Sequence, residues 1–273
     1  MREIFRQQKP LVSVIIPTHN SAKTLTACLK SIVAQSYPFI ELVVVDGYSD
    51  DETVNLANLF GAKVISCRGT QAAARNAGIT FSKGDYILFL DSDQQLSRRV
   101  IEECIYISLE HGVEAIKIPE KFIGTNFIGK CSALWKNRMV EAWGPHGGIP
   151  RFYKRSALPK PAAFRNEMRF WEDLELYMKL KSARLKETWC KSWVLHYELS
   201  SLISIVVKYV AYGKSISALR GEPMEALHVS MLRLTLSTLK KLLRKPESLT
   251  LFFGCLFLIA IKALSLFLGY MLK

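Results

Sequence analysis

Several common patterns are missing from this chain of 273 residues, and their absence narrows the possible functions. The six cysteines include no CxxC pair and no regular spacing, so we interpret them as reduced core residues of a cytosolic compartment. No G-x-G-x-x-G follows the first apolar run, which argues against a dinucleotide-dependent oxidoreductase. The first ten residues hold no apolar run of the signal-peptide type, so we expect the first domain to remain on the cytoplasmic side. Internal repeats and low-complexity segments are also absent from the sequence.

Acidic residues are scarce relative to basic ones. The chain has 24 Asp and Glu against 37 Lys and Arg, a formal net charge of +13. From Leu199 onward ten basic residues stand against three acidic ones, interleaved with long apolar side chains. Basic charge mixed with Leu, Ile, Val and Phe is more typical of a surface for anionic lipid than of one for nucleic acid. We therefore expect a membrane partner and no nucleic acid.

The first half of the chain alternates apolar runs of strand length with helical patterns. Strands are predicted at 11–17, 40–46, 62–66 and 86–90, and helices at 51–60 and 70–81. A further helix follows the first strand, capped by Asn20 or Ser21, with an apolar stripe of Leu25, Leu29, Ile32 and Val33. Such an order predicts an α/β fold of Rossmann-like type, in which helices cover both faces of a mainly parallel sheet.

The second half is less regular. Helical patterns cover 97–110 and 172–181, strand patterns cover 113–118, 151–155 and 193–196, and the Gly-rich and aromatic stretch 122–150 resists assignment. We expect one catalytic domain over residues 1–198 and a different C-terminal part over 199–273.

The C-terminal part predicts contact with a membrane. Two basic amphipathic helices, the second ended by Pro246, precede the almost wholly apolar segment 249–272. This segment is long enough to span a bilayer, and the basic cluster 240–245 would then lie on the cytoplasmic side. A central Lys262 keeps two other arrangements open: a pair of short interfacial helices hinged near Ala263, or a buried core helix.

The most informative feature is the stretch 85–93, an apolar run of strand length that ends in Asp91-Ser92-Asp93. A buried strand consists of apolar side chains, so we expect both carboxylates at its carboxyl end, outside the buried part. This is the edge of the sheet where α/β proteins bind ligands. Residues i and i+2 of an extended segment point the same way, and two hard oxygen ligands suit Mg²⁺ or Mn²⁺. Gln95 adds a third side-chain oxygen, while a helix N-cap cluster is the plainer alternative.

Other polar residues allow both a functional and a plain interpretation. Asp46 ends the second strand and could accept hydrogen bonds from a ribose or a base, or hold a turn. Arg75 could pair with phosphate or with a strand-end carboxylate. Glu172-Asp173 could cap a helix or supply a general base. His196 could be a further metal ligand, a phosphate contact or a satisfied polar residue.

Taken together, these blocks resemble family 2 glycosyltransferases, which are inverting enzymes of the GT-A fold. The likeness covers roughly 11–196 and rests on six segments in the family's order: Val12–Asn20, Val44–Thr53, Ala73–Ile79, Phe89–Asp93, Arg151–Arg155 and Trp171–Leu176. One departure is that Asp46 is followed by Gly47 where the commoner form has two adjacent acids. The Gln-x-x-Arg-Trp motif of processive polymerases is absent, which favours a single addition.

The resemblance implies a role for each matching residue. It implies that Pro17, Thr18, Asn20 and Asp46 border the nucleotide, that Asp91 and Asp93 hold a divalent cation with Gln95 near it, and that Asp173 is the catalytic base. From their positions in the sequence we add Arg75, Asp91 and Ser92 to the nucleotide-sugar site, His196 to the metal ligands and Glu172 to the catalytic residues.

The implied reaction moves one sugar from a nucleotide-diphosphate sugar to a hydroxyl of a glycan acceptor, for which the basic apolar tail favours a lipid-linked form. The alternative within the family is a polyprenyl-phosphate sugar synthase, in which Arg138, Arg151 or Arg155 would clamp the lipid phosphate. A nucleotidyltransferase fits less well, since no Gly-rich basic loop follows the first strand. A membrane-bound nucleotide-sugar-binding module without transfer activity is the alternative of another class.

Overall fold

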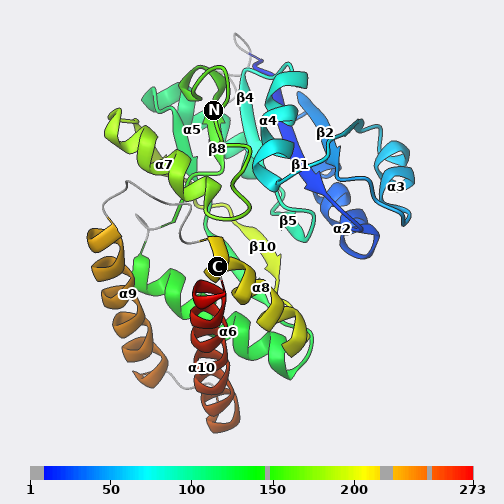
Figure 1. Cartoon of the computed structure of the whole chain (residues 1–273). Coiled ribbons are helices and arrows are strands. Elements are labelled where there is room, and N and C mark those ends of the chain that lie inside the picture. Colours follow the sequence, from blue (N-terminus) through cyan, green and yellow to red (C-terminus); the bar gives the residue numbers. More distant parts are fainter. Residues whose placement is uncertain (1–8, 145–147, 216–223, 245–247, 273) are drawn as a thin grey trace. The chain divides into compact units, whose positions relative to one another are not determined.

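The computed structural model describes residues 9–144, 148–215, 224–244 and 248–272, with side chains over 9–144, 148–215, 233–244 and 248–272 (Figure 1). The chain forms two compact units. Unit 1 runs from the N-terminus to Pro119 and over Ile149–Leu195, and unit 2 comprises Glu120–Gly148 and His196–Lys273. Residues 120–148 therefore group with the C-terminal helices. The predicted division of roles between residues 1–198 and 199–273 remains a prediction, because compactness assigns no role to either part.

Unit 1 is built on a seven-stranded sheet of order β3-β2-β1-β4-β8-β6-β9. Four neighbouring strands of this sheet pair in parallel: β1 (Val12–Thr18), β2 (Ile40–Asp46), the edge strand β3 (Lys63–Ser66) and β4 (Tyr86–Phe89). The register places Thr18 beside Asp46, so both strands end at one edge. This arrangement confirms the predicted α/β fold with a mainly parallel sheet.

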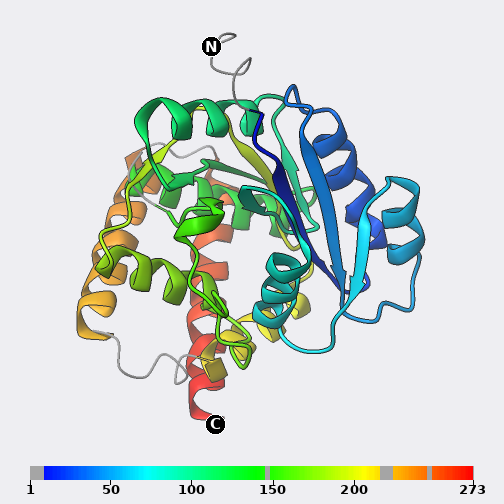
Figure 2. The ribbon, with the colours of Figure 1, turned by 90° about the horizontal axis from the view of Figure 1, so that it is seen from above.

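Helices cover both faces of this sheet. Successive side chains of a strand point to opposite faces, and the apolar residues on each face are buried by a helix. Val12, Val14 and Ile16 pack with α2 (Ala22–Val33) and α5 (Val100–His111) in one core cluster. Ile15 points the other way, against α4 (Gln71–Phe81), where Gly78 leaves room for it: a Cβ there would come 2.3 Å from Ile15 Cγ2. Figure 2 shows α2 and α4 on opposite sides of β1. The short helix α3 (Thr53–Leu59) lies between β2 and β3 in the chain.

The rest of unit 1 extends the sheet with mixed direction. Strand β8 (Phe152–Lys154) runs antiparallel to β4 and to β6 (Ala115–Lys117), while β9 (Glu187–Trp189) is parallel to β6. Helix α7 (Glu172–Ser182) matches the predicted helix, and η1 (Arg155–Ala157) follows β8. The sequence missed β9 and β5 (Gln94–Leu96), because three-residue strands carry too little periodicity to detect.

The start of α2 departs from the capping prediction. Ser21 stands at the N-cap of α2, but its hydroxyl makes no capping bond and donates to the His19 carbonyl at 3.3 Å. The Ala22 amide instead donates to Asp51 at 3.1 Å. The start of this helix is therefore held by the neighbouring loop.

Unit 2 is mainly helical. It contains α6 (Phe127–Trp143), α8 (Leu202–Ser215), α9 (Met224–Arg244) and α10 (Leu249–Met271), with strand β7 (Glu120–Ile123) and the end of β10 (Val194–Tyr197). Cys131, Leu134, Ile205, Leu242, Cys255 and Leu258 form its core. Helix α6 falls in the stretch that the sequence left unassigned, where Gly124 and Gly129 disturb the helical pattern.

Helix α10 is continuous through Ala263, so the alternative of two short helices hinged there is wrong. Of the helices described, it is the one that is long and apolar enough to cross a membrane. The predicted break at Pro246 lies outside the described residues, as do most of the first ten residues.

Candidate active site

The carboxyl ends of β1 and β2 are joined by a buried polar contact. Asp46 is 2% exposed, and its carboxylate accepts hydrogen bonds from the Thr18 hydroxyl at 3.0 Å and from Ser49 Oγ at 2.6 Å. The amide of Ser49 donates to it as well, at 2.8 Å. In the structure Asp46 therefore holds the turn after β2, and its predicted contact with the nucleotide remains a prediction.

The loop after β1 contacts the turn that follows β2. Asn20 adopts a left-handed conformation with φ of 49°, and its side-chain oxygen accepts the Asp50 amide at 3.0 Å. A residue with a short polar side chain tolerates that backbone, because the side chain bonds locally. Pro17 is the last but one residue of β1, and Ser92 donates to Ser21 at 3.1 Å. The residues predicted to border the nucleotide thus lie at strand ends and on the loops that follow them, at one edge of the sheet.

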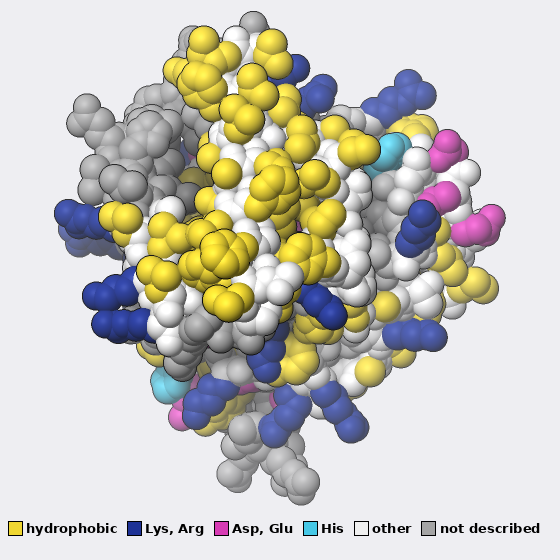
Figure 3. All heavy atoms as spheres, turned by 90° about the horizontal axis from the view of Figure 1, so that it is seen from below, with side chains coloured by type: hydrophobic (Ala, Val, Ile, Leu, Met, Phe, Trp, Pro, Cys, Tyr) yellow, Lys and Arg dark blue, Asp and Glu magenta, His cyan; other side chains and the backbone are white. Residues whose placement is uncertain are grey.

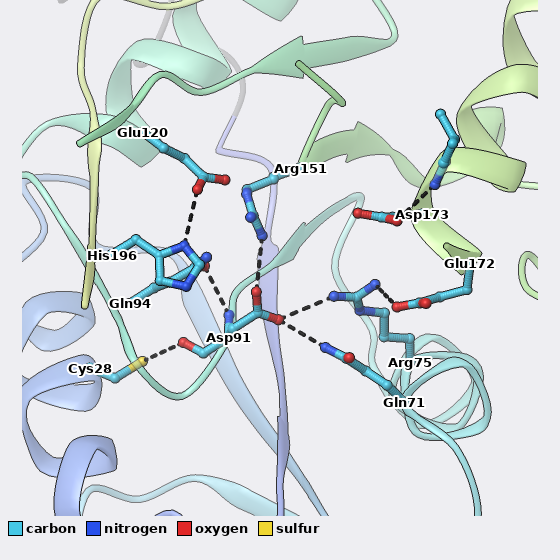
Figure 4. Close-up of polar contacts among 11 residues, drawn as sticks. Cys28, Gln71, Arg75, Asp91, Gln94, Glu120, Arg151, Glu172, Asp173 and His196 are labelled. Carbon is cyan, nitrogen blue, oxygen red and sulfur yellow. Dashed lines mark hydrogen bonds and ion pairs between the residues drawn. The ribbon is translucent and has the colours of Figure 1, made fainter. Parts of the chain in front are cut away.

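Asp91 follows β4 and is the centre of a cationic and amide cluster (Figure 4). Its Oδ1 accepts hydrogen bonds from Arg75 Nη2 at 3.1 Å and from Gln71 Nε2 at 3.0 Å. Its Oδ2 faces Arg151 Nη1 at 3.4 Å. With a side chain 26% exposed, this carboxylate is oriented by protein groups from two elements while it still reaches solvent.

Arg75 joins this strand end to the start of α7. Its Nη1 donates to Glu172 Oε1 at 2.6 Å while Nη2 binds Asp91, so one planar guanidinium bridges two carboxylates 81 residues apart in the chain. The side chain is nearly buried, and its Cζ lies 5.8 Å from the ring centres of both Phe89 and Phe164. Of the two roles that the sequence left open for Arg75, pairing with a strand-end carboxylate is the one seen.

Glu172 is strongly affected by its surroundings. Burial raises its pKa to about 7, and the negative charges of Asp173 and Asp91 act in the same direction, while the Arg75 cation opposes them. An acid whose proton is held near neutral pH, next to a second carboxylate, is typical of functional sites.

The start of α7 is held in an unusual backbone conformation. Trp171 immediately precedes the helix with φ of 69°, a left-handed conformation that a bulky residue adopts at a cost of about 1–3 kcal/mol. Asp173 follows in the first turn, and its Oδ1 accepts the Leu174 amide at 2.8 Å (Figure 4). The strained turn and the buried Glu172 together determine where the Asp173 carboxylate lies.

The predicted metal ligands Asp91, Asp93 and Gln95 lie close together in the chain after β4, and all three are half-buried. Among the described residues no group of three His, Cys, Asp or Glu side chains could hold a metal by itself. Mg²⁺ usually takes one or two protein carboxylates and completes its coordination with water and substrate phosphates. The oxygen-only donors Asp91 and Asp93 fit an ion of that kind.

His196 belongs to unit 2, where its Nδ1 lies 3.1 Å from Glu120 Oε2 and its ring packs on Phe122. The structure thus gives it a carboxylate partner, and its role as a metal ligand remains a prediction. Two of the suggested phosphate clamps also have partners. Arg138 binds Glu141 at 2.7 Å, and Arg155 donates to Ser82 Oγ and to the carbonyls of Gly84 and Ile79.

A family model gives the decisive comparison. The model of "Glycosyl transferase family 2" matches residues 13–162, more than half of the chain. The chain belongs to glycosyl transferase family 2. The resemblance derived from the sequence motifs is thereby confirmed, and membership of a transferase family supports the prediction of an enzyme.

Curated relatives of this family 2 chain are similar over shorter stretches. A "PGL/p-HBAD biosynthesis glycosyltransferase" of Mycobacterium bovis is 44% identical over 94 residues, which are 32% of this chain and 37% of that protein. The "Poly(ribitol-phosphate) beta-N-acetylglucosaminyltransferase TarS" of Staphylococcus aureus is 30% identical over 138 residues, 47% of this chain and 24% of that one. The likeness thus spans much less than half of these relatives.

Solved structures show the same fold over nearly the whole chain. The mannosyltransferase PcManGT from Pyrobaculum calidifontis, in complex with GDP-Man and Mn²⁺, matches with a TM-score of 0.59 and 19% identity, covering 97% of this chain and 83% of that one. TarS 1–349 of S. aureus in complex with UDP-GlcNAc matches with a TM-score of 0.55 and 18% identity, covering 94% and 81%. At these identities the likeness concerns the fold.

The sequence patterns did not predict the contacts that three residues make with Asp91: Gln71, Gln94 and Arg151. Gln71 lies four residues before Arg75 on α4, so the helical repeat could have found it. Gln94, fully buried, accepts the Asp91 amide at 3.0 Å, whereas only its neighbour Gln95 was predicted to act here. Arg151 was considered as a phosphate clamp, but the antiparallel β8 that brings it to Asp91 is a tertiary feature.

Proposed function

We propose that this protein is a metal-dependent, inverting glycosyltransferase that moves one sugar from a nucleotide-diphosphate sugar to a hydroxyl of a lipid-linked glycan. The observation that carries the proposal is the bridge made by Arg75 between Asp91 at the end of β4 and Glu172 at the start of α7. It ties the strand end that suits a diphosphate and its metal to the helix turn that holds a candidate base.

The donor is a nucleotide sugar on the evidence of family and fold. Solved structures of similar fold bind UDP, UDP-GlcNAc or GDP-Man with Mn²⁺, which supports a nucleotide-diphosphate donor and leaves the base open. Pro17, Thr18, Asn20, Asp46 and Ser92 are the residues we assign to the base and ribose.

Asp91, Asp93 and Gln95 would hold Mg²⁺ or Mn²⁺, with His196 as a further candidate ligand. When bound, the ion would neutralise negative charge on the departing nucleoside diphosphate. Arg75 and Gln71 keep the Asp91 carboxylate in one orientation, so little rearrangement is needed when the donor arrives.

Asp173 is the residue to which we assign the base. The acceptor oxygen attacks the anomeric carbon, the bond from that carbon to the diphosphate oxygen breaks, and the hydroxyl proton passes to the Asp173 carboxylate. A single displacement of this kind inverts the anomeric centre, as in inverting glycosidases with water in place of the acceptor. The engaged side chains of Arg138 and Arg155 favour a hydroxyl over a lipid phosphate as the attacking group.

The test is transfer of radiolabelled sugar from a panel of nucleotide sugars into a membrane lipid extract, with Mn²⁺ or Mg²⁺ and with Asp93→Ala as the control. Label in an organic-soluble product that disappears in the variant would support the proposal and identify the donor. A mild-acid-labile lipid bearing one sugar would favour the phosphate acceptor instead. Donor hydrolysis without a lipid product would move the acceptor to a glycan or protein, and no turnover of any donor would favour a binding module.

We further propose that unit 1 works on the cytoplasmic side of a membrane. The apolar helix α10 and the basic C-terminal part support this location. Recovery of the native protein in the cytosolic fraction after gentle lysis, with none on membranes, would argue against it.

A further inference from the structure

Helix α10 has the length and composition of a membrane span, yet it contacts its neighbours along most of its length. Near its start, Gly254 lies so close to α6 that a Cβ there would come 2.5 Å from Cys131 Sγ. Near its end, a Cβ at Gly269 would come 2.0 Å from the Val210 carbonyl oxygen of α8. Such close approaches mean that α10 cannot enter a bilayer without α6 and α8.

The middle of α10 is held by a polar network rather than by apolar contacts alone. Lys262 is 8% exposed, and its Nζ donates to Ser132 Oγ on α6 at 2.7 Å. Ser132 donates in turn to Glu198, at 2.7 Å, and Glu198 pairs with Lys136 at 2.6 Å. The basic residue that argued against a span is therefore turned toward the protein.

A spanning α10 would place polar parts of unit 2 at bilayer depth. Helix α6 exposes Lys130 and Glu141, and the irregular segment 198–201 lies next to the buried network. A charged side chain within a bilayer is costly to insert, and irregular backbone exposed to lipid is not tolerated there. The packing of unit 2 therefore opposes a span.

The opposite side of α10 presents one apolar stripe. Its exposed side chains recur every three or four residues along the helix and include Leu249, Phe253, Phe257, Leu264, Phe267 and Met271. On α8, Ile203 and Val207 are 76% and 63% exposed. Figure 3 shows hydrophobic side chains gathered on the face seen from below, with Lys and Arg side chains beside them. A stripe along the side of a helix suits a helix that lies in a membrane surface.

The charge of unit 2 indicates which partner fits this face. By sequence, unit 2 has fourteen Lys and Arg, six Glu and no Asp, a net charge of +8. A second copy would bring the same positive charge to the same face, whereas anionic lipid headgroups attract basic residues near the membrane surface and so complement it.

We propose that α10 and α8 bind in the plane of an anionic membrane surface, with the apolar stripe in the headgroup region and with no span. The inference concerns attachment only, and its tests do not depend on transfer activity. It deepens the proposed membrane location by assigning the face and the lipid class.

Vesicle binding tests the face and the lipid. The full chain is floated with phosphatidylglycerol–phosphatidylcholine vesicles and with phosphatidylcholine vesicles, and compared with Phe257→Asp/Phe267→Asp. The matched control is Leu59→Asp on α3, at a position that is 80% exposed in unit 1. We expect binding to the anionic vesicles to fall at least tenfold in the double variant and to be unchanged in the control. Equal binding by all three proteins, or equal binding to both vesicles, would overturn the proposal.

Labelling tests the orientation with the stripe intact, so it remains decisive if a charged variant misfolds. Thr250→Cys and Leu272→Cys are made in a Cys67→Ser background and labelled with an impermeant maleimide in sealed inverted membrane vesicles. Both ends of α10 should react without detergent. Reaction of one end only after detergent would establish a span. A stable dimer in light scattering that Phe257→Asp/Phe267→Asp abolishes, without vesicle binding, would show that a second copy covers the face.

Discussion

Each unit buries a cation in a network of ion pairs and hydrogen bonds, but the two networks differ in how far their carboxylates are exposed. In unit 1, Arg75 bridges Asp91 and Glu172, and Asp91 keeps a partly exposed carboxylate at the end of the sheet. In unit 2, Lys136 pairs directly with Glu198, and Lys262 reaches the same carboxylate through Ser132. The side chains of Glu198 and Lys262 are buried in this network. The difference lies in the carboxylates, since the side chain of Asp91 is 26% exposed and that of Glu198 is 6% exposed. An ion pair whose carboxylate reaches solvent at a sheet edge indicates chemistry, and one whose carboxylate is covered indicates helix packing.

The largest expected effect lies at the open site. Asp173→Asn should lower transfer by about 10²–10⁴-fold, because an amide cannot take the acceptor proton. The stability of the protein should change little, since this side chain is only half-buried and accepts a hydrogen bond from the adjacent Leu174 amide, which an amide oxygen can also accept. Steady-state transfer assays and thermal unfolding measure the two quantities. A full transfer rate in the folded variant would remove Asp173 from the proposed base role.

Removing the bridge should affect both stability and activity. Arg75→Leu leaves Glu172 buried without its cation and frees Asp91 to reorient, so we expect a loss of about 3 kcal/mol in the free energy of unfolding. Denaturant unfolding in a mild detergent checks the value. Arg75→Lys, which keeps the charge but not the two-pronged geometry, is the matched control and should recover part of the stability. Wild-type stability for Arg75→Leu would show that the bridge is not needed.

The raised pKa of Glu172 predicts a dependence of stability on pH. The folded protein keeps the proton up to about pH 7, whereas the unfolded chain loses it near the ordinary value of 4.5. Between these values the folded state binds more protons, so the free energy of unfolding should fall as pH rises, by about 3 kcal/mol.

Thermal unfolding from pH 4 to 8 checks this slope, with Glu172→Gln as the comparison. The variant cannot titrate at this position and should lose that part of the slope. An identical pH profile for both proteins would mean that the Arg75 cation outweighs burial and that Glu172 is charged throughout.

The smallest effect is expected in the network of unit 2 that contains Lys262 and Glu198. Lys262→Met removes the buried ammonium but leaves Glu198 paired with Lys136 and bonded to Ser132. Because an apolar side chain of similar length replaces a desolvated charge, we expect a change of about 1 kcal/mol or less in the free energy of unfolding. Glu198→Gln, which leaves two cations facing each other, should cost more. A loss above 3 kcal/mol for Lys262→Met would break the contrast between the units.

The sequence predicted the elements with strong local signals. The buried strands of unit 1 read as apolar runs, and α2, α4 and α7 have helical patterns, so the alternating order led directly to a parallel sheet. The segment Asp91-Ser92-Asp93 could be placed at the sheet edge because carboxylates cannot continue a buried strand. The six motif segments were enough to indicate the family, which the family model then confirmed.

Only the tertiary structure decided the pairings between distant segments. The chain has no local reason to bring Arg75 to Glu172, 97 residues later, or Lys262 to Ser132, 130 residues earlier. The orientation of α10 was hidden in the same way, since nearly all its residues are apolar and composition cannot distinguish the side that packs on protein from the side left exposed. Long-range ion pairs and close glycine contacts depend on how the folded elements pack against one another. Local patterns along the chain do not specify this packing.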